Sequence, residues 1–271
     1  MPSRYVAGET ARPWLRRRAS AFTTLGVVVD RHYSEAGLAK LYDRLSEPRQ
    51  DFEFYLPLIM SAGSVLDVGC GTGALLHLAR KAGHTRRLIG LDPAAGMLAA
   101  AKKQSSDIEW VLGDLASVSW DQEFDLVVMT GHAFQVLVED DEIRAALTAI
   151  RTALVEGGRF AFETRNPRAR EWGRWTANDA VEVVDDDGAV VRWERVVETV
   201  EGDRVTFTQT YTSPNWNRPQ ISRGTLRFLE ADSLSSFLSD TGFTIEEQFG
   251  DWDRQPLIEP SLEIITVARR G

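Results

Sequence analysis

The sequence predicts an α/β protein: a Rossmann-like, doubly wound sheet of about seven strands, mostly parallel with an antiparallel closing strand, plus a small antiparallel β insertion. Three observations support this fold. Short apolar runs alternate with segments of helical periodicity through residues 34–165, the pattern of successive βαβ units. The helices then stop, and residues 180–228 contain strand-like runs separated by turns. A last helix and two closing strands follow.

The first helix is expected from Ser34, because Leu38, Leu41 and Leu45 recur at helical spacings, and Pro48 starts a second helix. The remaining elements of the larger domain are expected as strands at 64–68, 87–91, 108–112, 124–129, 159–163, 243–249 and 262–268, and as helices at 74–82, 93–103, 140–154 and 233–241.

Within the insertion, Asp187-Gly188 and Gly202-Asp203 are typical of hairpin turns. The acidic run Asp185–Asp187 could be interpreted as a metal site, but a solvated hairpin tip is the better interpretation, and no metal is predicted.

Three segments follow from this organisation. Residues 30–170 and 229–271 are expected to form the main domain with N-terminal lid helices, and residues 171–228 the insertion on the substrate side. Residues 1–29 are basic, unlike the rest of the chain, and are expected to be disordered or dispensable.

The composition and charge of the chain limit the kinds of partner that it is expected to bind. The chain has 271 residues and a net charge of -9, which disfavours binding to nucleic acid. Its single cysteine excludes an internal disulfide and fits a cytoplasmic location. No apolar stretch approaches the ~18 residues of a membrane span, so no membrane partner is expected. Monomer and homodimer both remain open.

The most informative run is Val65–Ala74, a strand that ends in Gly69, Gly71 and Gly73 and opens a helix. Such a loop lets a ligand approach the backbone closely. The spacing also fits a relaxed dinucleotide fingerprint. However, Asp67 lies close to the loop, where its carboxylate would repel a pyrophosphate. It would suit a ligand with an ammonium group, such as S-adenosylmethionine.

Two further acids follow the next strands. Asp92 ends the second strand, where a carboxylate can accept hydrogen bonds from both ribose hydroxyls. Asp114, after Gly113 at the end of the third strand, could accept a hydrogen bond from an adenine amino group or could cap a helix.

At these residues the chain resembles the class I S-adenosylmethionine-dependent methyltransferases. The resemblance covers roughly residues 34–268 and is carried by VLDVGCGTG at 65–73, LIGLDPAAGML at 88–98, GD at 113–114, FDLVVMTGHAFQVL at 124–137 and GGRFAFETRNP at 157–167. The β insertion resembles that of small-molecule methyltransferases such as amino-sugar and glycine N-methyltransferases.

The resemblance implies S-adenosylmethionine as cofactor, with S-adenosylhomocysteine as product. It places Asp67 and the glycine loop at the methionine moiety, Asp92 at the ribose, and Arg49 at the cofactor's carboxylate. The full implied set is Tyr33, Tyr42, Arg49, Asp67, Gly69, Cys70, Gly71, Gly73, Asp92, Pro93, Met97, Gly113, Asp114, Leu115, Thr130 and Gly131.

His132 follows the fourth strand, where the transferred methyl should point, and is the best candidate for a general base. It could instead pack beside the cofactor. His32 is a second candidate, reaching the site from the N-terminal helix.

Aromatic residues are expected to form the side of the site that binds the methyl acceptor. The candidate residues are Phe134, Trp172, Trp175, Trp193 and Trp216. The tryptophans could form a pocket wall or a cation–π surface, or could pack the small sheet onto the main domain.

Together these features predict transfer of a methyl group to oxygen or nitrogen of a small-molecule acceptor, such as a specialised metabolite. The alternatives are an NAD-linked oxidoreductase and a non-catalytic S-adenosylmethionine-binding protein.

Overall fold

The computed structural model describes residues 36–46 and 48–271, with the side chains of residues 36–40 left out. The expectation for residues 1–29 and the candidates His32 and Tyr33 therefore lie outside the described residues. No helix of the described part is long and apolar enough to cross a membrane.

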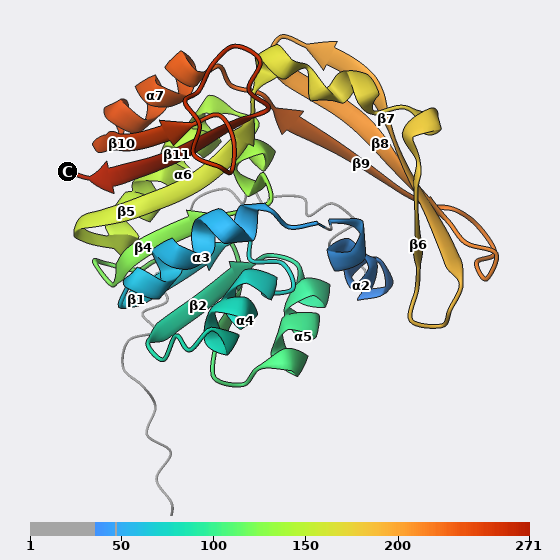
Figure 1. Cartoon of the computed structure of the whole chain (residues 1–271), viewed down its shortest axis with the longest axis horizontal. Helices are drawn as coiled ribbons and strands as arrows, with labels where there is room; N and C mark the ends of the chain where they lie inside the picture. The colour runs from blue at the N-terminus through green and yellow to red at the C-terminus, as the bar shows by residue number, and fades with distance from the viewer. Residues whose placement is uncertain (1–35, 47) are drawn as a thin grey trace, which may run out of the picture.

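The larger sheet has seven strands in the order β10-β11-β5-β4-β1-β2-β3 (Figure 1). Their bounds are β1 Ser64–Val68, β2 Arg87–Asp92, β3 Glu109–Leu112, β4 Phe124–Met129, β5 Leu154–Arg165, β10 Phe243–Phe249 and β11 Glu263–Arg270. The strands from β3 to β5 pair in parallel, and β11 pairs antiparallel with both β5 and β10. The predicted fold class is confirmed.

The sheet reverses its strand order beside β1. The chain runs outward through β2 and β3 and then returns to place β4 on the other side of β1. In open sheets of this kind, ligands bind at the carboxyl ends of the strands that flank such a switch point. The glycine loop begins at this position, after Val68.

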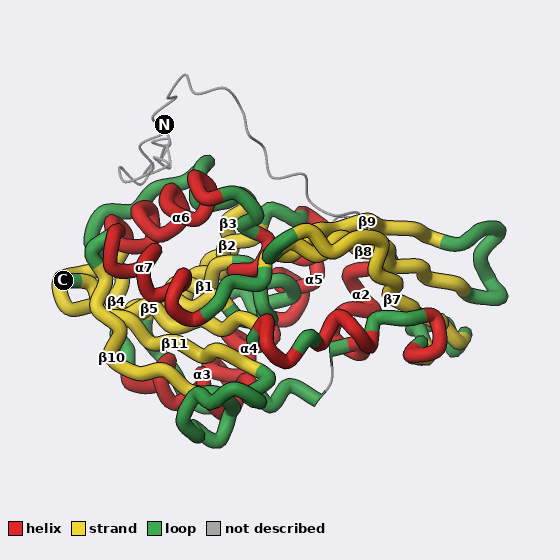
Figure 2. The backbone as a smooth tube through the Cα atoms, turned by 90° about the horizontal axis from the view of Figure 1, so that it is seen from above, coloured by secondary structure: helices red, strands yellow, loops and turns green. Residues whose placement is uncertain are grey.

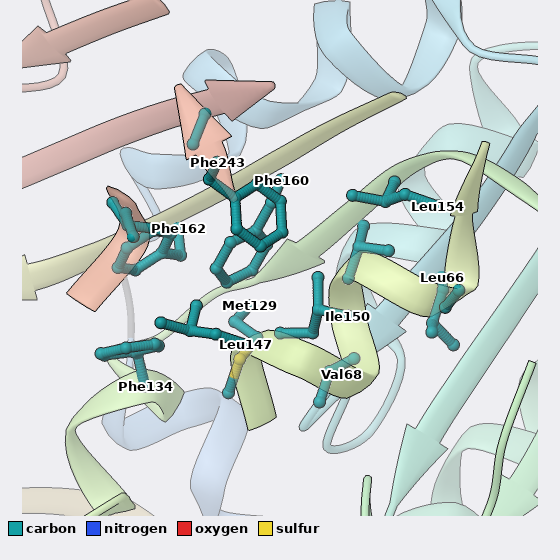
Figure 3. Packing of buried hydrophobic residues seen from close by; sticks show 14 of the residues in the cluster. Leu66, Val68, Met129, Phe134, Leu147, Ile150, Leu154, Phe160, Phe162 and Phe243 are labelled. Atoms are coloured by element: carbon teal, nitrogen blue, oxygen red, sulfur yellow. The ribbon is translucent and has the colours of Figure 1, made fainter. Parts of the chain in front are cut away.

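Helices cover both faces of this sheet. They are α3 Asp51–Ser61, α4 Ala74–Lys81, α5 Ala95–Gln104, α6 Asp140–Ala153 and α7 Ala231–Asp240. On one face, α3 and α4 pack against Val65, Val128 and Ile265. On the other, α6 and α7 pack against a core that includes stacked Phe160 and Phe162 (Figure 3).

The smaller sheet is antiparallel, in the order β6-β7-β8-β9. Its strands are β6 Val181–Val184, β7 Val190–Glu201, β8 Arg204–Thr212 and β9 Gln220–Arg227. Asp187-Gly188 and Gly202-Asp203 lie in the two hairpin turns, as predicted, and Asp185 accepts hydrogen bonds from the amides of Asp187 and Ala189. The sheet extends to one side of the larger one (Figure 2).

Helix α2, Ala36–Leu45, lies between the two sheets (Figure 1). Tyr42 packs on the buried side chains of Ala94 and Met97. Leu41 and Leu45 belong to a cluster within the small sheet. The helix therefore joins the main domain to the insertion.

Most element boundaries differ from the sequence expectation by one to three residues, the second helix for example beginning at Asp51 rather than Pro48, and two of the differences have a clear local cause. The fifth strand was expected at 159–163 but runs over 154–165, because it starts where α6 ends and passes through a bend at Gly157, where φ is +72°. The helix expected from Pro93 starts at Ala95, since Asp92 first accepts the amide of Ala94 and holds the chain in a turn.

Candidate active site

The glycine loop has a backbone conformation that requires glycine. Gly69, Gly71 and Gly73 all have φ between +55° and +74°, the left-handed region. A Cβ on Gly73 would also lie 2.1 Å from the Trp110 ring, which packs under the loop from β3. The loop is anchored to β2, because the amide of Gly69 donates to the carbonyl of Leu91 at 2.8 Å.

A small pocket that is open to solvent lies over this loop. Its walls come from β1, the glycine loop, the start of α4, the end of β4 and the segment that carries α2 and α3. The lining residues are Tyr42, Arg49, Phe52, Asp67, Gly69, Cys70, Gly71, Thr72, Ala74, Leu75 and Thr130. The predicted residues Tyr42, Arg49, Asp67, Gly69, Cys70, Gly71 and Thr130 are thus brought together.

Asp67 is the buried acid of this pocket. Its side chain is 1% exposed, and Oδ1 has no hydrogen-bond partner among the described residues. Burial raises the pKa of Asp67 from 3.8 to about 7, although the nearby Arg49 guanidinium lowers it. An unsatisfied buried carboxylate oxygen is costly and calls for a hydrogen-bond donor or a cation from a ligand.

Arg49 is held at the mouth of the pocket. Its guanidinium makes a bidentate pair with Asp51 at 2.9 and 2.6 Å and lies over the Phe52 ring, 4.1 Å from the centroid. Both contacts restrict the rotamer. The fixed guanidinium leaves a positive charge beside the pocket, which suits a ligand carboxylate.

Asp92 ends β2 with both carboxylate oxygens engaged. Oδ2 accepts the amide of Gly71 and Oδ1 the amide of Ala94, each at 2.8 Å. Burial raises its pKa, and the two amide bonds act to lower it. Each oxygen keeps a second lone pair, so the carboxylate can also accept from ligand hydroxyls.

Asp114 has a structural role that the sequence left open. Its Oδ1 accepts the amides of Ala116 and Ser117, at 3.1 and 2.8 Å, and so closes the turn after β3. Gly113 lies beside Asp92, because its amide donates to the Asp92 carbonyl at 3.1 Å.

The remaining implied cofactor residues surround the pocket without lining it. Met97 is buried against Tyr42. Leu115 packs against the core, Pro93 is half-buried after Asp92, and Gly131 follows Thr130, with a Cβ position 3.2 Å from the Tyr42 hydroxyl.

His132 occupies an unusual backbone position, with φ of +61°. Residues other than glycine are strained in this left-handed conformation, so the surrounding contacts must hold the His132 backbone there. Its amide donates to Oε1 of Glu163 at 2.7 Å, and the Tyr55 hydroxyl donates to Oε2 of the same buried glutamate. Glu163 therefore fixes the turn that carries His132.

The His132 ring contacts a second glutamate. Nε2 lies 2.9 and 3.1 Å from the two carboxylate oxygens of Glu263, the first residue of β11. Burial, with Arg165 adding to it, lowers the pKa of His132 to about 3. Burial raises that of Glu263 to about 8, against the effect of Arg165. Burial thus favours the neutral forms of both groups over a pair of opposite charges.

The tryptophans pack the small sheet. Trp175 is buried in a cluster with Phe207 and Phe228, and Trp172 stacks edge-on against Phe228 at 4.6 Å. Trp193 and Trp216 pack in the other cluster, which includes residues of α2.

Two guanidinium groups lie near these rings, and that of Arg165 is 5.8 Å from the Trp175 centroid. The Arg195 guanidinium is 4.5 Å from the Trp175 centroid and 5.0 Å from that of Trp193. Phe134, by contrast, is 1% exposed and packs on Phe162 in the main core, so we leave it out of the proposed acceptor site.

Sequence reasoning missed the residues that hold His132 and Arg49. Glu163, Glu263 and Tyr55 come from three separate elements that only folding brings together, whereas Asp51 lies two residues from Arg49 in the chain. Glu163 did lie inside the matched run GGRFAFETRNP, and its position at a strand end was a usable signal.

The known proteins that this chain resembles, in sequence and in structure, are methyltransferases. Residues 65–158 match the family described as "Methyltransferase domain". The chain is 35% identical over 138 residues to the 2-phytyl-1,4-naphtoquinone methyltransferase of Thermosynechococcus vestitus. This match covers 46% of the chain and 60% of the relative, so the likeness spans somewhat more than half of that enzyme.

Solved structures share the fold over most of the chain. The CcbJ methyltransferase of Streptomyces caelestis superposes with a TM-score of 0.70 at 19% identity, covering 88% of this chain and 98% of that one. CalS10, an amino pentose methyltransferase of Micromonospora echinaspora solved with S-adenosylmethionine bound, gives 0.64 at 22%, covering 85% and 94%. Residues 65–158 thus match the methyltransferase domain family, and most of the chain shares its fold with solved S-adenosylmethionine-dependent methyltransferases.

Proposed function

We propose that the protein transfers a methyl group from S-adenosylmethionine to a small-molecule acceptor. The observation that carries this proposal is the buried Oδ1 of Asp67, which lines the glycine-loop pocket without a hydrogen-bond partner among the described residues. An ammonium donates to and neutralises such an oxygen, whereas a pyrophosphate would be repelled by it. This asymmetry favours S-adenosylmethionine over a dinucleotide.

The described residues fit the cofactor at three points. Asp67 pairs with the ammonium of the methionine moiety, and Arg49 with its carboxylate. Asp92 accepts hydrogen bonds from the ribose hydroxyls through the lone pairs that its two backbone contacts leave. Tyr42 and Phe52 close the pocket from the side of α2 and α3.

S-adenosylmethionine supplies an activated methyl group on a cationic sulfonium. The protein therefore has to orient the acceptor, exclude water and take a proton. Orientation contributes up to about 7–11 kcal/mol in favourable cases. His132 is the proposed base, since it follows β4 and burial lowers its pKa so that the ring is neutral at pH 7.

The acceptor enters from the side of the small sheet. Residues 171–228 build this wall, and Trp193 lies on it half-buried, where its ring would contact an apolar part of the acceptor. The acceptor class proposed here is a small molecule. A cytoplasmic location is proposed from the single cysteine. Monomer and homodimer both stay open, because the insertion could serve as a lid or as a dimer interface.

The test compares ligands and then measures transfer. S-adenosylhomocysteine at about 100 times its dissociation constant should stabilise the protein by about 2.7 kcal/mol, and NAD should not. An equal shift with NAD would overturn the cofactor assignment. Binding without transfer to any component of a small-molecule extract would favour the non-catalytic alternative.

A further inference from the structure

We infer that Gln135 is a positioning residue that fixes the β insertion, and with it the proposed acceptor wall, relative to the methyl donor. This inference rests on the proposed methyl transfer. The observation that carries it is a set of hydrogen bonds from one buried amide to both ends of the insertion. Gln135 contacts Arg165, where the chain leaves the main sheet, and Arg227, at the end of β9, where the chain returns.

The side chain of Gln135 is 1% exposed and uses both of its polar atoms. Oε1 accepts from the backbone amide and from Nη1 of Arg165, at 3.3 and 3.0 Å. Nε2 donates to the carbonyl of Arg227 at 2.9 Å. A reversed amide would set Nε2 against two donors and Oε1 against a carbonyl, so only one orientation satisfies the site. Because buried polar groups are costly to leave unpaired, Gln135 fixes the spacing of the two strand ends.

Gln135 also lies beside the proposed transfer site. It belongs to the short 3-10 helix η1, Ala133–Val136, which begins directly after His132. Its backbone amide donates to the carbonyl of His132 at 3.0 Å. One residue therefore connects the turn after β4 with the place where the insertion joins the main domain, which we call the root of the insertion.

Buried polar contacts orient the insertion at this root. The Arg227 guanidinium is 11% exposed and pairs with Asp140 at the start of α6 at 2.7 Å and with Asp203 in the β7–β8 turn at 2.8 Å. At the far end, α2 contacts the insertion through the Arg44–Asp186 pair, which is about half exposed, and through apolar packing. Exposed pairs contribute little, and apolar packing is not directional. The orientation of the insertion is therefore set mainly at its root.

A small error at the root would become a large one at the acceptor wall. Arg227 of β9 pairs with Arg204 of β8. Tyr211, seven residues further along β8, pairs with Trp193 on the proposed wall. At about 3.3 Å per residue, Trp193 lies about 23 Å from the root, so a rotation of about 5° would move it by about 2 Å. A misplacement of about 1 Å can cost about 10²-fold in rate. Gln135 is thus expected to affect the placement of the acceptor.

The first experiment measures amide hydrogen exchange of the full-length protein saturated with S-adenosylhomocysteine. Gln135→Leu keeps an apolar side chain of similar size and removes the three side-chain hydrogen bonds. Exchange in β7, β8 and β9 should become about tenfold faster, while β1 and β4 keep the wild-type rate. Wild-type exchange in β7–β9 would overturn the inference. Equal acceleration in β1 and β4 would also overturn it, because it would show a general loss of stability.

Gln248→Leu is the matched control. Gln248 is half-buried in β10 and donates to Oγ1 of Thr266 in β11 at 3.3 Å, so this variant loses a glutamine hydrogen bond far from the insertion. Its β7–β9 exchange should match the wild type, and acceleration there would count against a specific role for Gln135. If Gln135→Leu does not fold, Gln135→Met takes its place, since a flexible methionine fills the same space without hydrogen bonding. The same outcomes then decide.

The second experiment connects this contact to the acceptor. Each protein receives S-adenosylmethionine with a labelled methyl group and increasing amounts of a small-molecule cell extract. Gln135→Leu should need about tenfold more extract for half-maximal transfer. Its calorimetric affinity for S-adenosylhomocysteine should stay unchanged, because Gln135 is not among the residues that line the cofactor pocket.

The outcomes separate this inference from the proposed function. Transfer by Gln135→Leu with the extract dependence of the wild type would overturn the positioning role and leave the methyltransferase proposal intact. Loss of affinity for S-adenosylhomocysteine in a folded Gln135→Leu would show that the residue acts on the cofactor pocket instead, which also overturns the inference. No transfer by the wild type, with S-adenosylhomocysteine still bound, would overturn the proposed function itself.

Discussion

The carboxylate of Asp92 accepts a hydrogen bond from the backbone amide of Gly71, 2.8 Å away. This contact ties the end of β2 to the glycine loop that follows β1. The residue proposed for the ribose therefore also shapes the part of the pocket proposed for the methionine moiety. A change at one site is expected to disturb the other.

Asp92→Ala should weaken binding of S-adenosylhomocysteine by about 1.5–3 kcal/mol, because a charge-assisted acceptor is lost. Asp92→Asn should cost less, since its remaining oxygen can still accept the Gly71 or the Ala94 amide. Calorimetry on variants shown by circular dichroism to be folded gives the comparison. Wild-type affinity in folded Asp92→Ala would remove this residue from the cofactor site.

Asp67→Asn should stabilise the ligand-free protein above neutral pH and weaken cofactor binding. The pKa of Asp67 is raised to about 7 in the fold from 3.8. Its protonated form therefore favours folding: the contribution is full below pH 3.8 and is lost as the pH rises to about 7. The variant avoids this loss, which is on the order of 1–4 kcal/mol.

Urea unfolding of the wild type and Asp67→Asn at acid and alkaline pH tests the sign. The stability difference should grow as the pH rises, while calorimetry shows reduced affinity for S-adenosylhomocysteine. A difference that is the same at every pH would mean that Asp67 is not the buried titrating group.

Asp43→Ala should speed release of S-adenosylhomocysteine. The buried Thr72 hydroxyl of the glycine loop donates a hydrogen bond to the carboxylate of Asp43 in α2 at 2.7 Å. This contact links α2 to the loop. Loss of one such bond corresponds to about 0.5–1.5 kcal/mol. The rate is read by stopped-flow displacement.

Arg44→Ala is the matched control for that variant. Arg44 pairs with Asp186 at the hairpin tip, where both side chains are about half exposed, at 42% and 53%. Exposed pairs contribute only about 0–1 kcal/mol, so this change should leave the release rate near that of the wild type. Faster release in Arg44→Ala than in Asp43→Ala would place the closing contact on the small sheet instead.

Gly90→Ala should destabilise the protein by about 1–3 kcal/mol through overpacking. The new Cβ would lie 2.6 Å from the Trp110 ring and 2.8 Å from the Cys70 sulfur. Trp110→Leu should recover part of this loss in the double variant, which thermal unfolding can measure. Simple additivity of the two changes would show that Trp110 is not the obstacle.

His132→Ala should lower the single-turnover rate by about 10²–10⁴-fold and leave affinity for S-adenosylhomocysteine nearly unchanged. The loss should shrink at high pH, where the acceptor loses its proton without help. If the ring only packs beside the cofactor, affinity should fall instead and the rate should change less. Both quantities are measured on the same variant once an acceptor is known.

Much of the fold was predictable from local pattern. Buried parallel strands such as Phe124–Met129 are mostly apolar in sequence. The spacing of Ile143, Leu147 and Ile150 indicates one face of a helix. The hairpin turn at Asp187-Gly188 was predictable because Gly188 has a φ of +81°, which glycine adopts without strain. These signals depend on neighbours in the sequence, and the structure confirms them.

The sequence by itself determined the glycine loop, its acid Asp67 and the order of the strands, because turn chemistry and periodicity act over a few residues. Only the tertiary structure decided which side chains meet across the sheet. Glu263 lies 131 residues from His132 in the chain, yet its carboxylate contacts the imidazole ring. The reason is that β11 pairs with β5 in a register that no local pattern specifies, so contacts between distant strands follow from the packed sheet alone.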